Sequence, residues 1–263
     1  MSLMSALDRG TASIDWCESN YRYSPIIAEF INTVTNILFL VFPALLSQLF
    51  KQYAQTVNRG VYVIWFLFAT VGICSAYFHA TLSLVGQLLD ELAILWLMAA
   101  AFGMWLPRRH YPLWLNRDRK QFQYLMFSLS LFGSMISCLY PWFNCIALMC
   151  LGIPAFVFLG MELKECRNSR VKRLGLRCFL CWIFAMFSWI FDRLFCDVWS
   201  AVNFPYLHGL WHILIAITSY TICVLFAYFD AIKEHEEKQP VLMFWPRNEF
   251  QLGVPYVVLK NAN

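Results

Sequence analysis

Three histidines lie in apolar, membrane-length stretches of the sequence. His79 closes the segment Ser75-Ala-Tyr-Phe-His79, and His208 and His212 enclose the segment His208-Gly-Leu-Trp-His212. An ionisable side chain in a bilayer segment is costly and therefore indicates a functional site. Residues four positions apart share one face of a helix, so His208 and His212 can act together. With His79 from another helix they form the three-ligand set that catalytic zinc commonly uses, which leaves a fourth position for water.

Two further polar groups are expected close to these histidines. Ser75 precedes His79 by one helical turn on the same face, and Asp90 and Glu91 follow a short turn after this segment. A carboxylate beside a metal-bound water can serve as a general base. The sequence therefore predicts a zinc site at the histidines, with Ser75 and Asp90 as catalytic residues.

Each of these residues also has a simpler interpretation. A histidine in a membrane can be only an interhelical hydrogen-bonding group. Ser75 can be a packing residue that bonds the backbone one turn back, and Asp90 and Glu91 can cap a helix. Asp192, at the end of a later apolar stretch, either supports a metal ligand from outside or pairs with Arg193. His79 lies near the end of one apolar stretch, and His208 and His212 lie near the start of another. All three are therefore expected at the same depth in the membrane, which favours the metal interpretation.

The composition indicates the elements that must position these groups. Hydrophobic residues make up 60% of the 263-residue chain and charged residues only 14%, whereas soluble domains carry about 25% charged residues. Seven apolar stretches are near the roughly 20 residues that a membrane-spanning helix needs. They cover residues 26–50, 61–83, 87–106, 122–140, 143–162, 175–192 and 206–229. We predict an all-α integral membrane protein, a seven-transmembrane helix bundle that forms a single domain over residues 1–263.

The distribution of positive charge predicts the orientation of this bundle. The chain has 20 Lys and Arg residues, and all except Arg9, Arg22 and Arg193 fall in one set of loops or in the tail. These loops are residues 51–60, 107–121 and 163–177. Short cytoplasmic loops carry the Lys and Arg excess. The N-terminal segment, residues 1–25, is therefore expected to be lumenal and the tail, residues 230–263, cytosolic. The net charge of +4 follows from this asymmetry and does not point to nucleic acid.

A group of oxygen-bearing side chains marks the N-terminal segment. Asp15, Glu18, Asn20 and Glu29, with the backbone carbonyl of Trp16, could supply the six to eight oxygens that calcium prefers. The spacing is not that of an EF-hand. Helix capping by Asp15 or Asn20 is the simpler interpretation.

The ten cysteines fall into two groups. Most lie in apolar segments, where a small buried cysteine is ordinary packing. Cys17 and Cys196 instead fall on the predicted lumenal side, which is oxidising. They form either a disulfide or two free thiols.

Several short motifs together resemble the alkaline ceramidase family. They are Asp15-Trp-Cys-Glu18-x-Asn20, Glu29-Phe-x-Asn32-Thr, Ser75-x-Tyr-Phe-His79-x-Thr-Leu, Gln87-Leu-Leu-Asp90-Glu91 and Tyr206-x-His208-x-x-Trp-His212. The motifs occur in the family's order and at its separations. The similarity runs from about residue 14 to Phe244-Trp245-Pro246, and within the family it is greatest to the Golgi-type branch.

The resemblance implies an activity and a set of sites. It implies a seven-helix amidase that hydrolyses ceramide, taken from the bilayer, to sphingosine and a fatty acid, in the Golgi or endoplasmic reticulum. Membrane lipids would surround it as partners. It implies zinc at the three histidines, with Ser75 and Asp90 in the catalytic pocket, and a disulfide between Cys17 and Cys196. It also implies a structural calcium at Asp15, Trp16, Glu18, Asn20 and Glu29.

Two other functions fit a polar cluster inside a helical bundle. A receptor of the adiponectin-receptor type would have a similar seven-helix, three-histidine zinc design. A transporter would use the cluster as an ion relay, but transporters usually show internal repeats and broken helices, and no repeat is evident in this sequence.

Overall fold

The computed structural model describes residues 3–261. Seven helical segments among them are long and apolar enough to cross a membrane, as predicted. They are Phe30–Leu49, which comprises α2 (Phe30–Thr35) and α3 (Leu38–Leu49), then α5 (Val61–Thr81), α6 (Leu84–Trp105), α7 (Arg119–Leu139), α8 (Phe143–Glu165), α9 (Ser169–Leu194) and α11 (Leu207–Glu234). The shorter elements are α1 (Leu3–Ala6), α4 (Lys51–Thr56), α10 (Cys196–Ala201), three 3₁₀ turns (Arg108–His110, Leu113–Leu115 and Glu236–Lys238) and the strands β1 (Pro240–Trp245) and β2 (Val254–Leu259).

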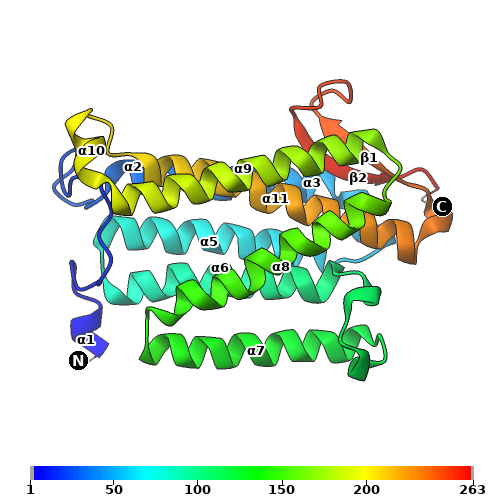
Figure 1. Ribbon diagram of the computed structural model, residues 1–263, viewed down its shortest axis with the longest axis horizontal. Helices are drawn as coiled ribbons and strands as arrows, with labels where there is room; N and C mark the ends of the chain where they lie inside the picture. The colour runs from blue at the N-terminus through cyan, green and yellow to red at the C-terminus, as the bar shows by residue number, and fades with distance from the viewer. Residues whose placement is uncertain (1–2, 262–263) are drawn as a thin grey trace.

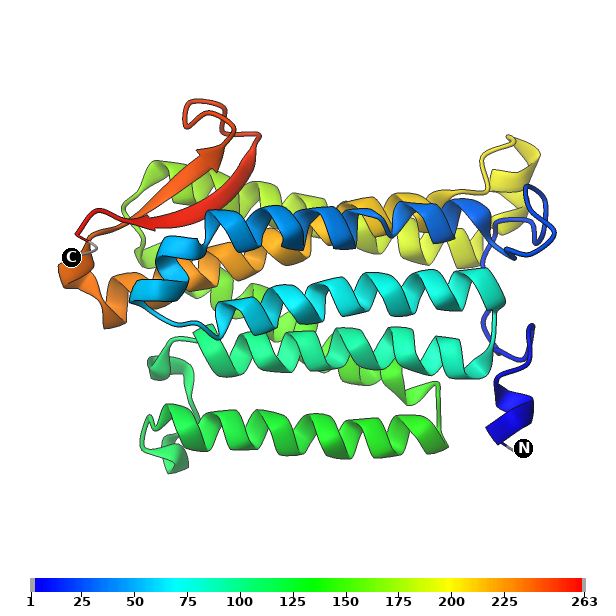
Figure 2. The same ribbon diagram turned by 180° about the vertical axis from the view of Figure 1, so that it is seen from behind.

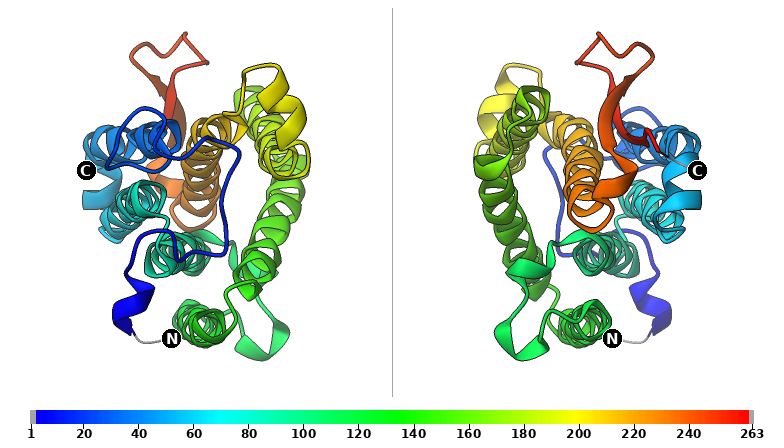
Figure 3. Two further views of the ribbon diagram at one scale, coloured as in Figure 1. Left: turned by 90° about the vertical axis from the view of Figure 1, so that its left-hand side faces the viewer. Right: turned by 90° about the vertical axis from the view of Figure 1, so that its right-hand side faces the viewer.

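The helices lie side by side along the long axis of the molecule (Figures 1 and 2). The N-terminus, α10 and the turn between α5 and α6 are at one end, and the C-terminal strands are at the other. The two ends of the chain therefore lie at opposite ends of the bundle, as an odd number of spans requires. Viewed end-on, α8 crosses obliquely from the outlying α7 toward α9, and α11 lies between α9 and the first helices (Figure 3).

The first span begins later than the sequence suggests. Residues 26–29 are not helical, and they bond to the end of α5: the Ala28 N–H donates to Ala80 O (3.1 Å) and the Glu29 N–H to His79 O (3.0 Å). The helix begins at Phe30 because the Glu18 carboxylate accepts hydrogen bonds from the first free backbone N–H groups of α2. Glu29 thus precedes the helix instead of lying within it.

The turn between α5 and α6 is shorter than predicted. Leu82 adopts a left-handed conformation (φ 49°) and ends α5. The Ser83 hydroxyl then caps α6 by accepting from the Gly86 N–H (3.1 Å). Helix α6 therefore starts at Leu84, and Asp90 and Glu91 lie well inside it. The alternative that these two carboxylates cap the helix is wrong.

Helix α9 also starts earlier than the predicted residue 175. The Asn168 side chain caps it by accepting from the Arg170 N–H (2.9 Å), so several arginines of the predicted loop are helical. Arg170 and Arg177 then bond to the loop between the strands, through Asn248 and the carbonyl of Gln251 respectively. The folded tail gives these arginines partners, which allows the helix to extend.

The tail contains a two-stranded sheet that the all-α prediction did not include. Strands β1 and β2 pair antiparallel, with Pro240 opposite Leu259 and Trp245 opposite Val254. The buried faces of the strands pack against α4 and α11. The Gln52 side chain of α4 bonds both backbone groups of Leu259 and thereby joins the sheet to the bundle.

Candidate metal centre

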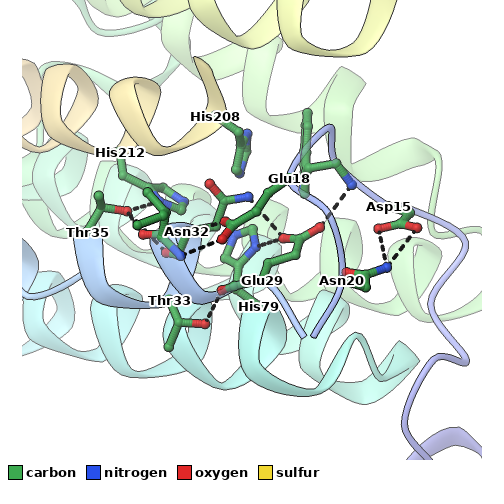
Figure 4. A network of polar contacts seen from close by, with 12 residues as sticks. Asp15, Glu18, Asn20, Glu29, Asn32, Thr33, Thr35, His79, His208 and His212 are labelled. Atoms are coloured by element: carbon green, nitrogen blue, oxygen red, sulfur yellow. Dashed lines mark hydrogen bonds and ion pairs between the residues drawn. The ribbon is translucent and has the colours of Figure 1, made fainter. Parts of the chain in front are cut away.

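The three histidines converge, as the sequence predicts. His79 comes from the last turn of α5, and His208 and His212 come from the first two turns of α11. One ring nitrogen of each lies within 4.8 Å of those of the other two. All three side chains are buried, with at most 2% exposed. Figure 4 shows them around a common point. This group could hold a metal ion.

The hydrogen bonds of the rings show which nitrogens are free to bind a metal. His79 Nδ1 lies 2.5 Å from Glu29 Oε2, and His212 Nδ1 lies 2.9 Å from Thr35 Oγ1. His79 Nε2, His208 Nδ1 and His212 Nε2 are buried and have no partner within the described residues. A buried polar atom without a partner is costly, and a metal ion would provide the partner. Ligating histidines typically give their other nitrogen to a carboxylate or another polar group, so the residues present fit a metal such as zinc.

Two residues of the surrounding segments fix His208 in place. The indole of Trp16 stacks on the imidazole of His208, with ring centroids 3.6 Å apart. The buried Asp192 accepts from the His208 N–H through Oδ1 (3.0 Å) and from the Cys17 N–H through Oδ2 (3.0 Å). Asp192 thus ties the start of α11 to the N-terminal segment. The guanidinium of Arg193 lies over the Trp16 ring instead, 5.5 Å from its centroid.

A disulfide reinforces this connection. Cys17 and Cys196 are bonded, with Cα atoms 5.3 Å apart. The bond links the N-terminal segment to the start of α10, and of the two alternatives left open by the sequence the disulfide is confirmed.

The acidic residues of the N-terminal segment gather next to the histidines (Figure 4). Glu29 accepts from the Trp16 N–H (3.0 Å) and from the Asn32 amide (3.1 Å) while it contacts His79. The Asn20 amide bonds both oxygens of Asp15, each at 3.1 Å. Neither Asp15 nor Asn20 caps a helix.

Glu18 has the capping role that the sequence assigned to Asp15 or Asn20. Its two oxygens accept from the Ile31 N–H (2.7 Å) and the Asn32 N–H (2.8 Å). Its position 13 residues before Ile31 hides this role in the sequence, because a usual cap is adjacent to its helix.

The carboxylates of this segment also repel one another. Burial raises the pKa of Glu18, and the negative charge of Glu29 adds to the rise. Burial raises the pKa of Asp15 in the same way, again with a contribution from Glu29. No Lys or Arg of residues 3–261 forms an ion pair with these three carboxylates. A bound cation would relieve their repulsion.

A cavity of about 560 Å³ opens beside the histidines. His208, His212, Ser75 and Asp90 line one part of it, and the Ser75 side chain interacts with the Asp90 carboxylate. The structure thus places Ser75 and Asp90 in the lining of the same cavity as His208 and His212. The remaining wall is mainly apolar and aromatic and comes from α6, α8, α9 and α11. Its lining extends from Gln87 to Trp105 on α6, about 27 Å at the usual helical rise.

Sequence reasoning did not identify two residues that contact the histidines or Glu29, namely Thr35 and Asn32. Thr35 is one of many small polar residues in apolar sequence, and nothing marks it as the partner of His212. Asn32 appears only within the Glu29-Phe-x-Asn32-Thr motif, where its three-residue distance from Glu29 is the signal for the bond between them.

Comparison with known proteins agrees with this geometry. The family model described as Ceramidase matches residues 8–258. An alkaline ceramidase of Drosophila melanogaster is 49% identical over 252 residues, which are 96% of this chain and 89% of that protein. The human alkaline ceramidase 1 is 39% identical over 250 residues, 95% of each chain. A Caenorhabditis elegans alkaline ceramidase is 34% identical over 254 residues, 94% of this chain and 93% of its own. The chain belongs to the alkaline ceramidase family of hydrolases.

Proposed function

We propose that this protein is a zinc-dependent intramembrane amidase that hydrolyses the amide bond of ceramide to sphingosine and a free fatty acid. The observation that carries the proposal is the set of three buried, unpartnered histidine nitrogens beside Ser75 and Asp90 at the polar part of an apolar cavity. Such a cavity suits a lipid with long chains and one polar group. The relatives named alkaline ceramidase supply the substrate.

The residues around the centre have distinct roles in this reaction. His79, His208 and His212 would hold zinc, which supplies Lewis acidity to the amide carbonyl and to water. Asp90 accepts the proton of the water that attacks the carbonyl carbon. It returns a proton to the nitrogen as the C–N bond breaks. Ser75 donates a hydrogen bond to the carbonyl oxygen as that atom gains negative charge.

The wall of the cavity supports entry of the substrate from the bilayer. Only 17% of the spanning part of α8 is buried, and Ile153 and Val157 present exposed apolar side chains on its surface. The same helix contributes Leu148 and Met149 to the cavity. A lipid passing between helices would therefore keep its chains in apolar surroundings from the bilayer to the metal centre.

Calcium would have a structural role in the N-terminal segment. The proposed ligands are the side chains of Asp15, Glu18, Asn20 and Glu29 with the carbonyl of Trp16. Mutual repulsion of the carboxylates supports this site, and hard cations prefer such oxygens. Glu29→Gly should then weaken activity without removing a zinc ligand. Full activity of this variant in chelator-treated buffer would refute the calcium proposal.

The charge distribution supports the orientation, and the resemblance to the Golgi-type branch suggests the location. We propose a lumenal N-terminal segment (1–25), a cytosolic tail (230–263) and a single membrane domain over residues 1–263 in the Golgi or endoplasmic reticulum, as in the Golgi-type branch. An acceptor site for N-glycosylation inserted near residue 10 should be modified, and one in the tail should not. Glycosylation of the tail would reverse the orientation.

One experiment tests the activity and separates it from the receptor alternative. Purified protein should hydrolyse ceramide, and His79→Ala and Asp90→Ala should abolish the turnover. A panel of ceramides with different acyl lengths, assayed with and without calcium, would define the substrate range. Bound zinc without hydrolysis of any ceramide would instead favour an adiponectin-receptor-like receptor.

A further inference from the structure

A second polar cluster joins α6 to α8. The Gln87 amide donates to Glu91 Oε1 (3.2 Å), and the Asn144 amide donates to Glu91 Oε2 (2.5 Å). Gln87 and Asn144 are each 1% exposed. The oxygens of both amides, Gln87 Oε1 and Asn144 Oδ1, are buried and have no partner within residues 3–261.

This cluster belongs to the same cavity as the metal centre. Gln87 and Glu91 line the cavity together with Ser75 and Asp90, and Asn144 stands behind Glu91 at the start of α8. The apolar lining farther along α6, from Ile94 to Trp105, continues away from this polar part. A lipid whose chains occupy the apolar part and whose amide reaches Asp90 would thus place its polar head near the cluster.

The hydrogen-bonding capacity of the cluster determines what it can bind. The Gln87 and Asn144 amides each donate an N–H to the Glu91 carboxylate. This fixes the orientation of both amides, so that their oxygens remain as acceptors. The cluster therefore has two acceptor oxygens without a partner among the described residues, Gln87 Oε1 and Asn144 Oδ1. An apolar ligand would leave these oxygens unsatisfied at a cost. A ligand with hydroxyl groups would satisfy them.

We infer that the Gln87–Glu91–Asn144 cluster is the subsite for the hydroxyl groups of the sphingoid base. The inference rests on the proposed ceramide hydrolysis. A substrate hydroxyl donates to Gln87 Oε1, while Glu91 and Asn144 are positioning residues that hold the Gln87 amide in this orientation. The enzyme then selects lipids whose sphingoid hydroxyls are free, because a buried site that bonds a hydroxyl disfavours an analogue without it.

The alternative role of the cluster is purely structural. Polar bonds between membrane helices also stabilise a bundle, and loss of such a bond would lower the hydrolysis of every substrate equally. The difference between two substrates therefore separates the roles. The test substrates are a ceramide and two analogues of the same acyl length, one without the C1 hydroxyl and one without the C3 hydroxyl.

The experiment compares kcat/KM of wild type and Gln87→Leu on these substrates. Wild type should prefer ceramide to at least one analogue by about 10-fold or more. Gln87→Leu should lower kcat/KM for ceramide by a similar factor and leave that analogue nearly unchanged. Glu91→Gln, which keeps the side-chain volume, should reduce the same preference by a smaller factor and keeps the test open if Gln87→Leu fails to fold.

Ser134→Ala is the matched control. It removes another bond between helices, from Trp96 Nε1 to Ser134 Oγ (3.1 Å), outside the cavity lining, and should leave the substrate preference unchanged. Equal losses on all substrates, or a wild type without preference, would overturn the hydroxyl subsite. Failure of wild type to hydrolyse any ceramide would instead refute the proposed function.

Discussion

The two ends of the bundle hold buried carboxylates in different ways. At the end opposite the histidines, Glu162 is 2% exposed and is contacted by Arg109 (2.9 Å), His110 (2.7 Å) and Lys233 (2.7 Å). Asp230 is paired with Arg119 at 2.6 Å. These contacts join the loop after α6, α8 and α11. Buried charges at this end are neutralised by the protein itself.

At the end that contains the three histidines, called here the metal end, the buried carboxylates described in residues 3–261 have no Lys or Arg partner. Glu18, Glu29 and Asp192 accept from backbone N–H groups, an amide and an imidazole, and none is within ion-pair distance of a Lys or Arg of residues 3–261. The negative charge here remains available to bound cations. The comparison shows that, within the described residues, the buried carboxylates are paired with Lys or Arg at one end only, and that those at the other end lie beside the candidate metal site.

The largest effect is expected from loss of a proposed metal ligand. His212→Ala leaves two histidines, so the protein should lose its zinc and fall to background ceramide hydrolysis. The decrease should exceed the roughly 10- to 100-fold typical of residues that only support a ligand. Metal analysis of the purified variant and a turnover assay measure both. Retention of one zinc per chain with full activity would contradict the assignment.

Asp90→Asn should distinguish the residue that accepts a proton in the reaction from the residues that bind zinc. The substitution keeps the shape of the side chain and removes its ability to accept a proton. Turnover should fall by about 10²- to 10⁴-fold, while the zinc content stays at the wild-type level. A variant that loses zinc together with activity would show that Asp90 supports the metal instead.

Glu29→Gln removes the negative charge beside His79 and changes the shape of the side chain very little. The amide can still bond Asn32 or His79, but it lacks the negative charge that strengthens His79 as a ligand. Zinc affinity, measured by competition with a chelator of known affinity, should fall by about 10- to 100-fold. An unchanged affinity would mean that the contact at 2.5 Å does not tune the metal.

The smallest effect on chemistry is expected at the opposite end. Glu162→Gln leaves Arg109 and Lys233, whose side chains are about a third exposed, without their shared charged partner, and the loss of such charged hydrogen bonds should cost about 1.5–3 kcal/mol of stability. The melting temperature should fall while the zinc content and the turnover per folded molecule are unchanged. Glu165→Gln is the matched control, because Glu165 also pairs with Arg109 but is 63% exposed, and its loss should cost at most about 1 kcal/mol.

The sequence predicts the helices and the histidines well because both depend on local patterns. Apolar length identifies all seven spans. The four-residue spacing of His208 and His212 puts them on one helix face. Successive spans cross the membrane in opposite directions, so His79 at the end of the second span lies at the same depth as the start of the seventh. These inferences need no knowledge of how the helices pack.

The supporting contacts could not be predicted because they depend on packing between distant segments. Glu18 caps a helix that starts 12 residues later, and Asn144 reaches Glu91 only because α8 passes α6 at that level. The two strands of the tail pair with each other across a loop and pack on α4 and α11, and these contacts are not visible in the sequence. Helix bounds shifted because hydropathy does not mark the caps: Asn168 lies before the predicted stretch 175–192, and Ser83 lies at the end of the stretch 61–83.

The separation of His79 from His208 and His212 along the chain affects the order of assembly. During synthesis, Glu29 and His79 emerge with the first two spans, whereas the other two histidines emerge only with the last helix. A ribosome that has released six spans has made one third of the ligand set. A metal held by these three histidines can therefore be bound only after α11 has been made, because a chain truncated before α11 lacks two of the three candidate ligands.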